Sequence, residues 1–135
     1  MRKLESIIIH CSATSEKQNF DVDDIRQWHT EKGWSDIGYH YVITRAGEIQ
    51  EGRFIEKVGA HAKGYNDHSV GICLVGGINS ETEKADANFT FSQYQALAKI
   101  KDQLFDAFGE LEIIGHRDVS SKDCPCFDVH SFFNS

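Results

Sequence analysis

The sequence predicts a single α/β domain with a central mixed β-sheet flanked by helices. Three short apolar runs, at residues 4–12, 70–75 and 111–115, are typical of buried strands. Two amphipathic segments lie between them, and the length of 135 residues fits one domain. We therefore treat residues 1–135 as one unit.

The first half of the chain predicts a strand, a helix and a hairpin. Residues 4–12 are too apolar and β-branched for a surface helix of that length, so we expect a buried strand. Asp21 is a suitable N-cap for a helix with apolar residues at three-residue spacing, and Gly33 would end it. Residues 38–45 alternate as a strand, and a turn leads to a second strand at residues 48–51.

The second half predicts a loop, a long helix and two further strands. Residues 57–69 form a glycine-rich loop before the buried strand at residues 70–75. Thr90 and Gln93 make a capping-box pattern ahead of a long amphipathic helix. A last strand at residues 111–115 follows that helix.

Charge and hydropathy exclude several classes of protein. Lys and Arg total 14 against 21 Asp and Glu, and this net charge of −7 argues against a nucleic-acid partner. No apolar stretch approaches the length of a membrane helix, and the N-terminus lacks the features of a signal peptide. We expect a monomer that is made in the cytoplasm, with no membrane partner and with cysteines present as thiols.

Two histidines and a cysteine from opposite ends of the chain could bind a metal. His10 ends the first apolar run, and His116 and Cys124 lie in a short, loop-like segment near the C-terminus. Three such ligands would leave zinc with an open position for water, which is typical of a hydrolytic site. If the first run is a strand, His10 faces opposite to Cys11, so only one of them can join a site on a given face.

Each ligand also has a structural interpretation. His10 could be a packed core residue, and Cys124 could be incidental in a surface loop. Cys126 competes with Cys124, and a structural site could draw on Cys11 and Cys73, although no Cys-x-x-Cys knuckle is present. The sequence contains no His-Glu-x-x-His motif, nucleophile elbow or phosphate loop.

Lys122 is a candidate for a charge beside the metal. Pro125 favours an extended conformation at Cys124, which would place Lys122 and Cys124 on the same side of the chain. A nearby cation would favour the thiolate form of the cysteine without itself binding the ion.

A second cluster lies at residues 38–41. In a strand, Tyr39 and Tyr41 would share one face and His40 the other. Such a tyrosine pair is either ordinary packing, or one phenol faces the metal and hydrogen-bonds the attacking water or the substrate.

Several motifs occur in an order that resembles one known family. They lie at residues 9–14, 26–29, 33–34, 38–40, 61–66, 73–77, 87–90 and 122–125. Together they resemble the N-acetylmuramoyl-L-alanine amidases of the type-2 amidase and peptidoglycan-recognition-protein superfamily, across nearly the whole chain. The resemblance implies the fold of that superfamily over residues 1–135.

The resemblance also implies a ligand set and catalytic residues. Zinc would be held by His10, His116 and Cys124. Tyr39 and Lys122 would be catalytic: Lys122 would stabilise the oxyanion, and Tyr39 would orient the water or relay a proton. The convergence of the two histidines is implied by the family and not by their spacing.

The substrate implied by the family is bacterial peptidoglycan, cut between N-acetylmuramic acid and L-alanine. His61 and Asn66 lie in a loop that resembles the muropeptide-facing edge of the family's groove, so we expect both to contact substrate. The whole resembles a phage or prophage endolysin that acts on the cell wall after release.

Two other functions are compatible with this resemblance. Superfamily members without the ligand cysteine bind peptidoglycan without cutting it, and the presence of Cys124 argues against that function. A phage member also inhibits a phage RNA polymerase, which is a second candidate partner. Only nine residues precede His10, and the chain ends soon after Phe132 and Phe133; both features differ from that phage member and argue against the polymerase role, which stays the second candidate.

Overall fold

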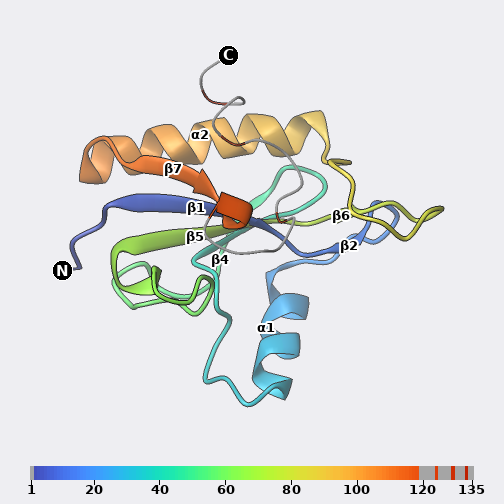
Figure 1. The fold of residues 1–135 in the computed structure, drawn as a ribbon, viewed down its shortest axis with the longest axis horizontal. Helices are drawn as coiled ribbons and strands as arrows, with labels where there is room; N and C mark the ends of the chain where they lie inside the picture. Colours follow the sequence, from blue (N-terminus) through green and yellow to red (C-terminus); the bar gives the residue numbers. More distant parts are fainter. Residues whose placement is uncertain (1, 119–123, 125–128, 130–132, 134–135) are drawn as a thin grey trace.

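A computed structural model describes residues 2–118, 124, 129 and 133 (Figure 1). The strands are β1 (Ser6–Cys11), β2 (Thr14–Ser15), β3 (Tyr41–Ile43), β4 (Ile49–Glu51), β5 (Ser69–Leu74), β6 (Gly77–Ile78) and β7 (Glu112–Gly115). The described helices are α1 (Val22–Glu31) and α2 (Phe91–Phe108), with short 3-10 turns at Asn66–His68 and His116–Asp118. None of the described helices is long and apolar enough to cross a membrane.

Five strands form one mixed sheet in the order β4-β3-β5-β1-β7. The β3 and β4 strands pair antiparallel, whereas the other neighbours are parallel. The short strands β2 and β6 pair in a separate sheet. Helix α2 lies along one face of the large sheet and α1 lies on the other side, so the predicted arrangement of a mixed sheet between helices is confirmed (Figure 1).

Both helices begin where the sequence predicts. The side chain of Asp21 accepts hydrogen bonds from the first turn of α1, and Thr90 and Gln93 form a reciprocal capping box at the start of α2. These caps satisfy backbone N–H groups that have no partner inside a helix, which typically contributes about 1 kcal/mol. Gly33, with φ of +95°, follows the end of α1.

The central strand β1 separates two sets of side chains. Ile7, Ile9 and Cys11 pack into the core beneath α2, while Ile8 and His10 face the opposite side. Because strand side chains alternate, burial of the isoleucines fixes the direction of His10. This face of the sheet carries the candidate site.

Strand β3 is shorter than the sequence predicts, and this changes the face on which Tyr39 lies. It begins at Tyr41, not at residue 38. Tyr41 packs against the core beneath α2, whereas Tyr39 packs on the opposite side with Val42 and Cys73. The expectation that Tyr39 and Tyr41 share a face is therefore wrong, because strict alternation applies only inside a regular strand.

Candidate active site

The structure brings together the three residues that the sequence predicts as metal ligands. One ligand atom from each of His10, His116 and Cys124 lies within 4.8 Å of the other two. The His10 and His116 rings are tilted by 51° with centroids 4.5 Å apart. These atoms are close enough for one ion, with ligand bonds of about 2.0–2.3 Å, to gather all three.

Strand pairing explains why two distant histidines meet. Strands β1 and β7 are parallel neighbours, with Ile9 aligned to Gly115. The residue after each of these two is a histidine: His10 lies within β1, and His116 follows β7 directly at the start of the 3-10 turn, so both lie at the carboxyl ends of neighbouring strands. Sequence spacing alone could not reveal this pairing.

Cys124 joins the cluster through the main chain of β1. Its Sγ lies 2.8 Å from the backbone nitrogen of Cys11, which donates to the sulfur. This bond holds the sulfur beside His10, and the deprotonated sulfur of a cysteine is the form that binds metals. The half-buried position of Cys124 leaves it accessible to a ligand.

The donor set fits zinc. Imidazole and thiolate are ligands that zinc prefers, and three protein ligands are typical of catalytic sites and not of closed structural ones. A structural site that includes Cys11 and Cys73 finds no support, because these thiols are buried in clusters on opposite faces of the sheet. Cys126, the other candidate ligand, lies outside the described residues.

Tyr39 lies directly beside the cluster. Its ring centroid is 5.0 Å from that of His10, and its phenol hydrogen-bonds the thiol of Cys73. Burial raises the pKa of this phenol well above its usual range, and the neighbouring thiols raise it further. Tyr39 is therefore a protonated hydrogen-bond donor at neutral pH.

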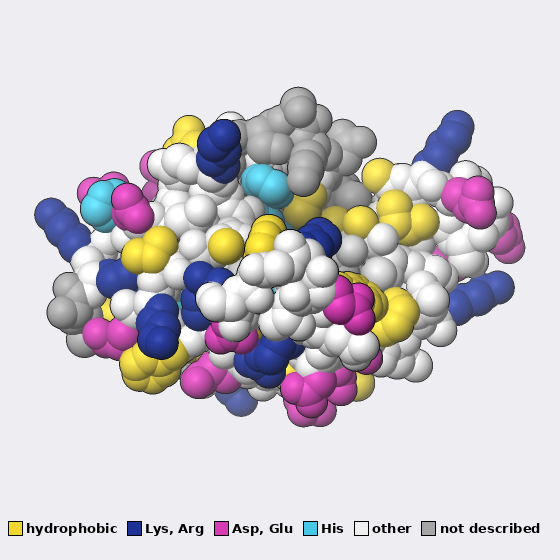
Figure 2. Space-filling model, turned by 90° about the horizontal axis from the view of Figure 1, so that it is seen from below, with side chains coloured by type: hydrophobic (Ala, Val, Ile, Leu, Met, Phe, Trp, Pro, Cys, Tyr) yellow, Lys and Arg dark blue, Asp and Glu magenta, His cyan; other side chains and the backbone are white. Residues whose placement is uncertain are grey.

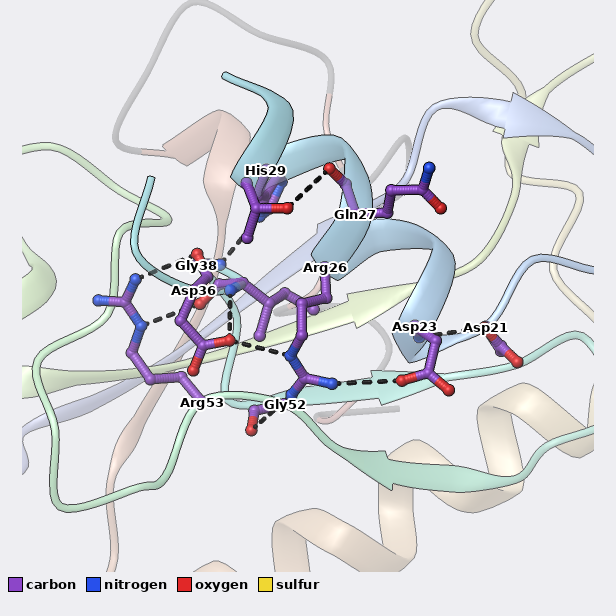
Figure 3. Close-up of polar contacts among 11 residues, drawn as sticks. Asp21, Asp23, Arg26, Gln27, His29, Asp36, Gly38, Gly52 and Arg53 are labelled. Atoms are coloured by element: carbon purple, nitrogen blue, oxygen red, sulfur yellow. Dashed lines mark hydrogen bonds and ion pairs between the residues drawn. The ribbon is translucent and has the colours of Figure 1, made fainter. Parts of the chain in front are cut away.

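The segment that carries Tyr39 is held by charged side chains (Figure 3). The carboxylate of Asp36 accepts hydrogen bonds from Arg26 Nε at 2.9 Å and from the Ile37 backbone at 2.8 Å. Arg53 donates to the carbonyl oxygens of Ile37 at 2.9 Å and Val58 at 2.7 Å. These side-chain bonds add to backbone bonds such as the one from Arg53 N–H to the carbonyl oxygen of Tyr39 at 2.8 Å, and together they hold the segment ahead of β3.

His29 of α1 supports the same segment. Its Nδ1 accepts the backbone N–H of Gly38 at 2.9 Å (Figure 3), and its ring packs 5.5 Å from that of Tyr39. Burial lowers the pKa of His29, and the positive charges of Lys32 and Arg53 lower it further. The ring is therefore neutral with its proton on Nε2.

A pocket of about 150 Å³ lies beside Tyr39. It is lined by Ser12, Ile25, Trp28, His29, Lys32 and Tyr39. Figure 2 shows the α1 side of the molecule, where a histidine reaches the surface near the centre next to hydrophobic side chains, and acidic and basic groups are interspersed. The pocket itself is lined by both polar and apolar side chains, which suits a polar ligand with some apolar surface.

His61 and Asn66 make contacts inside the protein. His61 Nδ1 lies 2.8 Å from His10 Nε2, and the side-chain oxygen of Asn66 accepts the backbone N–H groups of His61 and Ala62, each at 2.9 Å. Burial lowers the pKa of His61 to about 3, and neighbouring positive charges contribute to the shift. Substrate contact by His61 or Asn66 stays a prediction.

One predicted site residue is not described by the structure, and two supporting residues were not predicted from the sequence. Lys122 is not among the described residues, so its predicted position beside Cys124 stays a prediction. The supporting roles of His29 and Arg53 were missed. His29 occurred in a motif shared with the family, but a histidine within a helix carries no sign of the backbone group that it binds.

Comparisons with known proteins agree with this geometry. The profile of a family described as N-acetylmuramoyl-L-alanine amidase matches residues 1–127. The chain is 49% identical to the endolysin of Enterobacteria phage T3 and 47% identical to that of Escherichia phage T7, in each case over 93% of this chain and 82% of the relative. Among solved structures, the amidase LysC from Clostridium intestinale URNW superposes with a TM-score of 0.79 at 30% identity, over 92% of this chain and 77% of that one.

Proposed function

The chain belongs to the N-acetylmuramoyl-L-alanine amidase family and is an amidase, and on this premise we propose that it is a zinc-dependent endolysin. Its substrate is the amide bond between N-acetylmuramic acid and L-alanine of bacterial peptidoglycan. The observation that carries the zinc dependence is the meeting of His10, His116 and Cys124.

The three ligands define what the ion would contribute. Zinc held by two imidazoles and a thiolate supplies Lewis acidity and an open coordination position for hydrolysis near neutral pH. The N–H of Cys11 positions the sulfur of Cys124, and burial of His10 excludes bulk water from one side of the site.

Tyr39 and Lys122 act on the substrate in this proposal. The raised pKa of Tyr39 keeps its proton, and when substrate binds the phenol exchanges its bond to Cys73 for one to the attacking water or to a substrate oxygen. Lys122 provides a positive charge for the oxyanion that develops at the lactyl carbonyl, an effect worth roughly 3–4 kcal/mol for a well-placed donor. The assignment of Lys122 rests on sequence resemblance.

The pocket beside Tyr39 receives a part of the muropeptide next to the scissile bond. Tyr39 lines the pocket and also touches His10, so a group in the pocket lies within reach of the metal cluster. The neutral His29 provides a donor at Nε2, and Lys32 provides a cation.

We further propose that the protein acts as a monomer on the cell wall after release from the cytoplasm.

Digestion of purified peptidoglycan tests the reaction and the metal together. We expect new L-alanine amino termini, loss of activity on chelation, and recovery when zinc is added back. New reducing sugar ends without new amino termini would identify a glycosidase and contradict the proposal. If protein shown to be free of metal were fully active, the proposed zinc dependence would be wrong.

A further inference from the structure

The ring of His61 is in direct contact with a candidate zinc ligand. Its Nδ1 lies 2.8 Å from Nε2 of His10, and the two rings meet edge to face with centroids 4.9 Å apart. Only 1% of His10 and 8% of His61 is exposed, so water does not compete freely for this hydrogen bond.

Two arrangements of protons are compatible with these distances. His61 Nε2 lies 3.2 Å from Ser69 Oγ, so the three side chains form a chain of hydrogen bonds. In one arrangement His10 Nε2–H donates to His61, and His61 Nε2–H donates to Ser69. In the other, Ser69 donates to His61 and His61 donates to His10.

A bound metal discriminates between the two arrangements. A neutral imidazole carries one proton, and only the nitrogen without it can bind a metal. In the first arrangement His10 keeps its proton on Nε2 and presents the lone pair of Nδ1 to the ion. In the second, Nε2 accepts a bond from His61 and the proton of His10 occupies Nδ1, which prevents coordination at either nitrogen.

Close packing holds the His61 ring in place. A Cβ atom at Gly71 would lie 2.5 Å from Cγ of His61, and one at Gly59 would lie 2.8 Å from its Cδ2. Gly71 is aligned with Ile8 in the sheet, so it lies on the face that carries His10. The two glycines create the space that this ring occupies, and Asn66 fixes its backbone.

We propose that His61 is a positioning residue of the metal site, which accepts the Nε2 proton of His10 and so directs Nδ1 of His10 to the ion. Ser69 completes the chain by accepting the Nε2 proton of His61. This inference rests on the proposed zinc site. It gives His61 a role other than the substrate contact expected from the sequence, and the two roles predict different measurements.

Zinc affinity of the whole protein, measured by competition with a chromophoric chelator, tests the role without reference to activity. We expect His61→Ala to weaken zinc binding about 10- to 100-fold, as loss of such a partner typically does. His61→Asn should recover most of this loss, because its side-chain oxygen can accept near the position of Nδ1. The exposed His68 provides a matched control, and His68→Ala should bind zinc as the wild type does.

The outcomes separate this inference from the proposed function. Wild-type protein that binds no zinc would refute the zinc site, and this inference with it. Wild-type protein that binds zinc tightly, with equal affinity in His61→Ala, would overturn the inference alone. An increase in KM without loss of zinc affinity would assign His61 to the substrate instead.

Nuclear magnetic resonance of the zinc-loaded wild type gives a result that does not depend on a variant folding. Long-range ¹⁵N–¹H correlations should show the His10 and His61 protons on Nε2, with zinc on Nδ1 of His10. A proton on Nδ1 of His61, or zinc on Nε2 of His10, would overturn the proposal.

Discussion

The Sγ atom of Cys124 accepts a hydrogen bond from the backbone N–H of Cys11 at 2.8 Å, across 113 positions of sequence. Cys11 follows His10 directly, so this bond places the thiol next to the imidazole. The side chain of Cys11 faces the core beneath α2, and only its main chain contributes to the site. The two cysteines therefore have separable roles.

Cys124→Ser should lose zinc and activity together. A serine hydroxyl is a poor zinc ligand compared with a thiolate. Loss of a residue that only hydrogen-bonds a ligand typically weakens metal binding by up to about 100-fold, so we expect loss of the ligand itself to weaken it more than that. Bound zinc can be measured by mass spectrometry and activity by new L-alanine amino termini. Cys11→Ala keeps the N–H donor and should retain zinc. An equal loss of zinc in both variants would contradict the assignment.

Tyr39→Phe should retain zinc and lose most of the turnover. The substitution keeps the ring that packs against His10 and His29 but removes the phenol donor. Loss of a general acid or a positioned donor typically reduces kcat by about 10²- to 10⁴-fold. Steady-state kinetics with zinc quantified in the same samples checks this. An active Tyr39→Phe enzyme would restrict Tyr39 to packing.

Lys122→Ala should also retain zinc while kcat falls. Removal of a well-placed oxyanion donor typically costs about 10²- to 10³-fold in kcat. Lys122→Arg keeps a positive charge and should recover part of the activity. If Lys122→Ala lowered zinc affinity as strongly as Cys124→Ser, the lysine would act on the ligand set and not on the substrate.

The parts of the fold governed by local pattern could be predicted from the sequence. The isoleucines of β1 predicted a buried strand, and Thr90 with Gln93 predicted the start of α2. Each depends on neighbours within a few residues. The prediction for Tyr39 was wrong because the conformation of its segment depends on side chains distant in sequence, such as that of Arg53.

The candidate site shows the same division. The chemistry of His10, His116 and Cys124 could be recognised from residue type, but their meeting depends on β1 lying beside β7. No local pattern encodes which strands are neighbours, so the convergence came from the family resemblance. The contact of His61 with His10 likewise depends on the path of a loop across the sheet.

His40 should make the protein sensitive to acid. It is fully buried, its Nδ1 accepts the N–H of Gly71 at 3.0 Å, and its Nε2 lies 2.8 Å from the carbonyl oxygen of Lys57. Burial lowers its pKa to about 4, and the nearby charge of Arg2 also disfavours a second proton. Protonation would turn the Nδ1 acceptor into a donor that faces another donor.

The sign of the pH effect follows from the lowered pKa. The unfolded chain binds this proton near pH 6.5, before the folded protein does, so the stabilisation is complete above that pH and is lost as pH falls towards 4. We expect a loss of about 3 kcal/mol from His40 alone, at roughly 1.4 kcal/mol per pKa unit.

Chemical denaturation of metal-free protein between pH 7 and pH 4 measures this effect. His40→Asn keeps an acceptor for Gly71 but cannot gain a proton. It should be less stable at pH 7 by about 1–3 kcal/mol, because the bond to Lys57 is lost, and should show a shallower decline with acid. Parallel declines in wild type and variant would show that other groups govern the acid sensitivity.

Arg53→Ala should reduce turnover without loss of zinc, because Arg53 holds the segment of Tyr39 and touches no candidate ligand. Its guanidinium donates to the carbonyl oxygens of Asp36, Ile37 and Val58, so its removal leaves several acceptors without their donor. Arg53→Lys should not rescue, since an ammonium group cannot reproduce this fork of donors. We expect faster amide exchange across residues 36–40 and a fall in kcat of at least about tenfold, since even 1.4 kcal/mol of misplacement has that effect. Unchanged exchange with reduced kcat would instead place Arg53 in contact with the substrate.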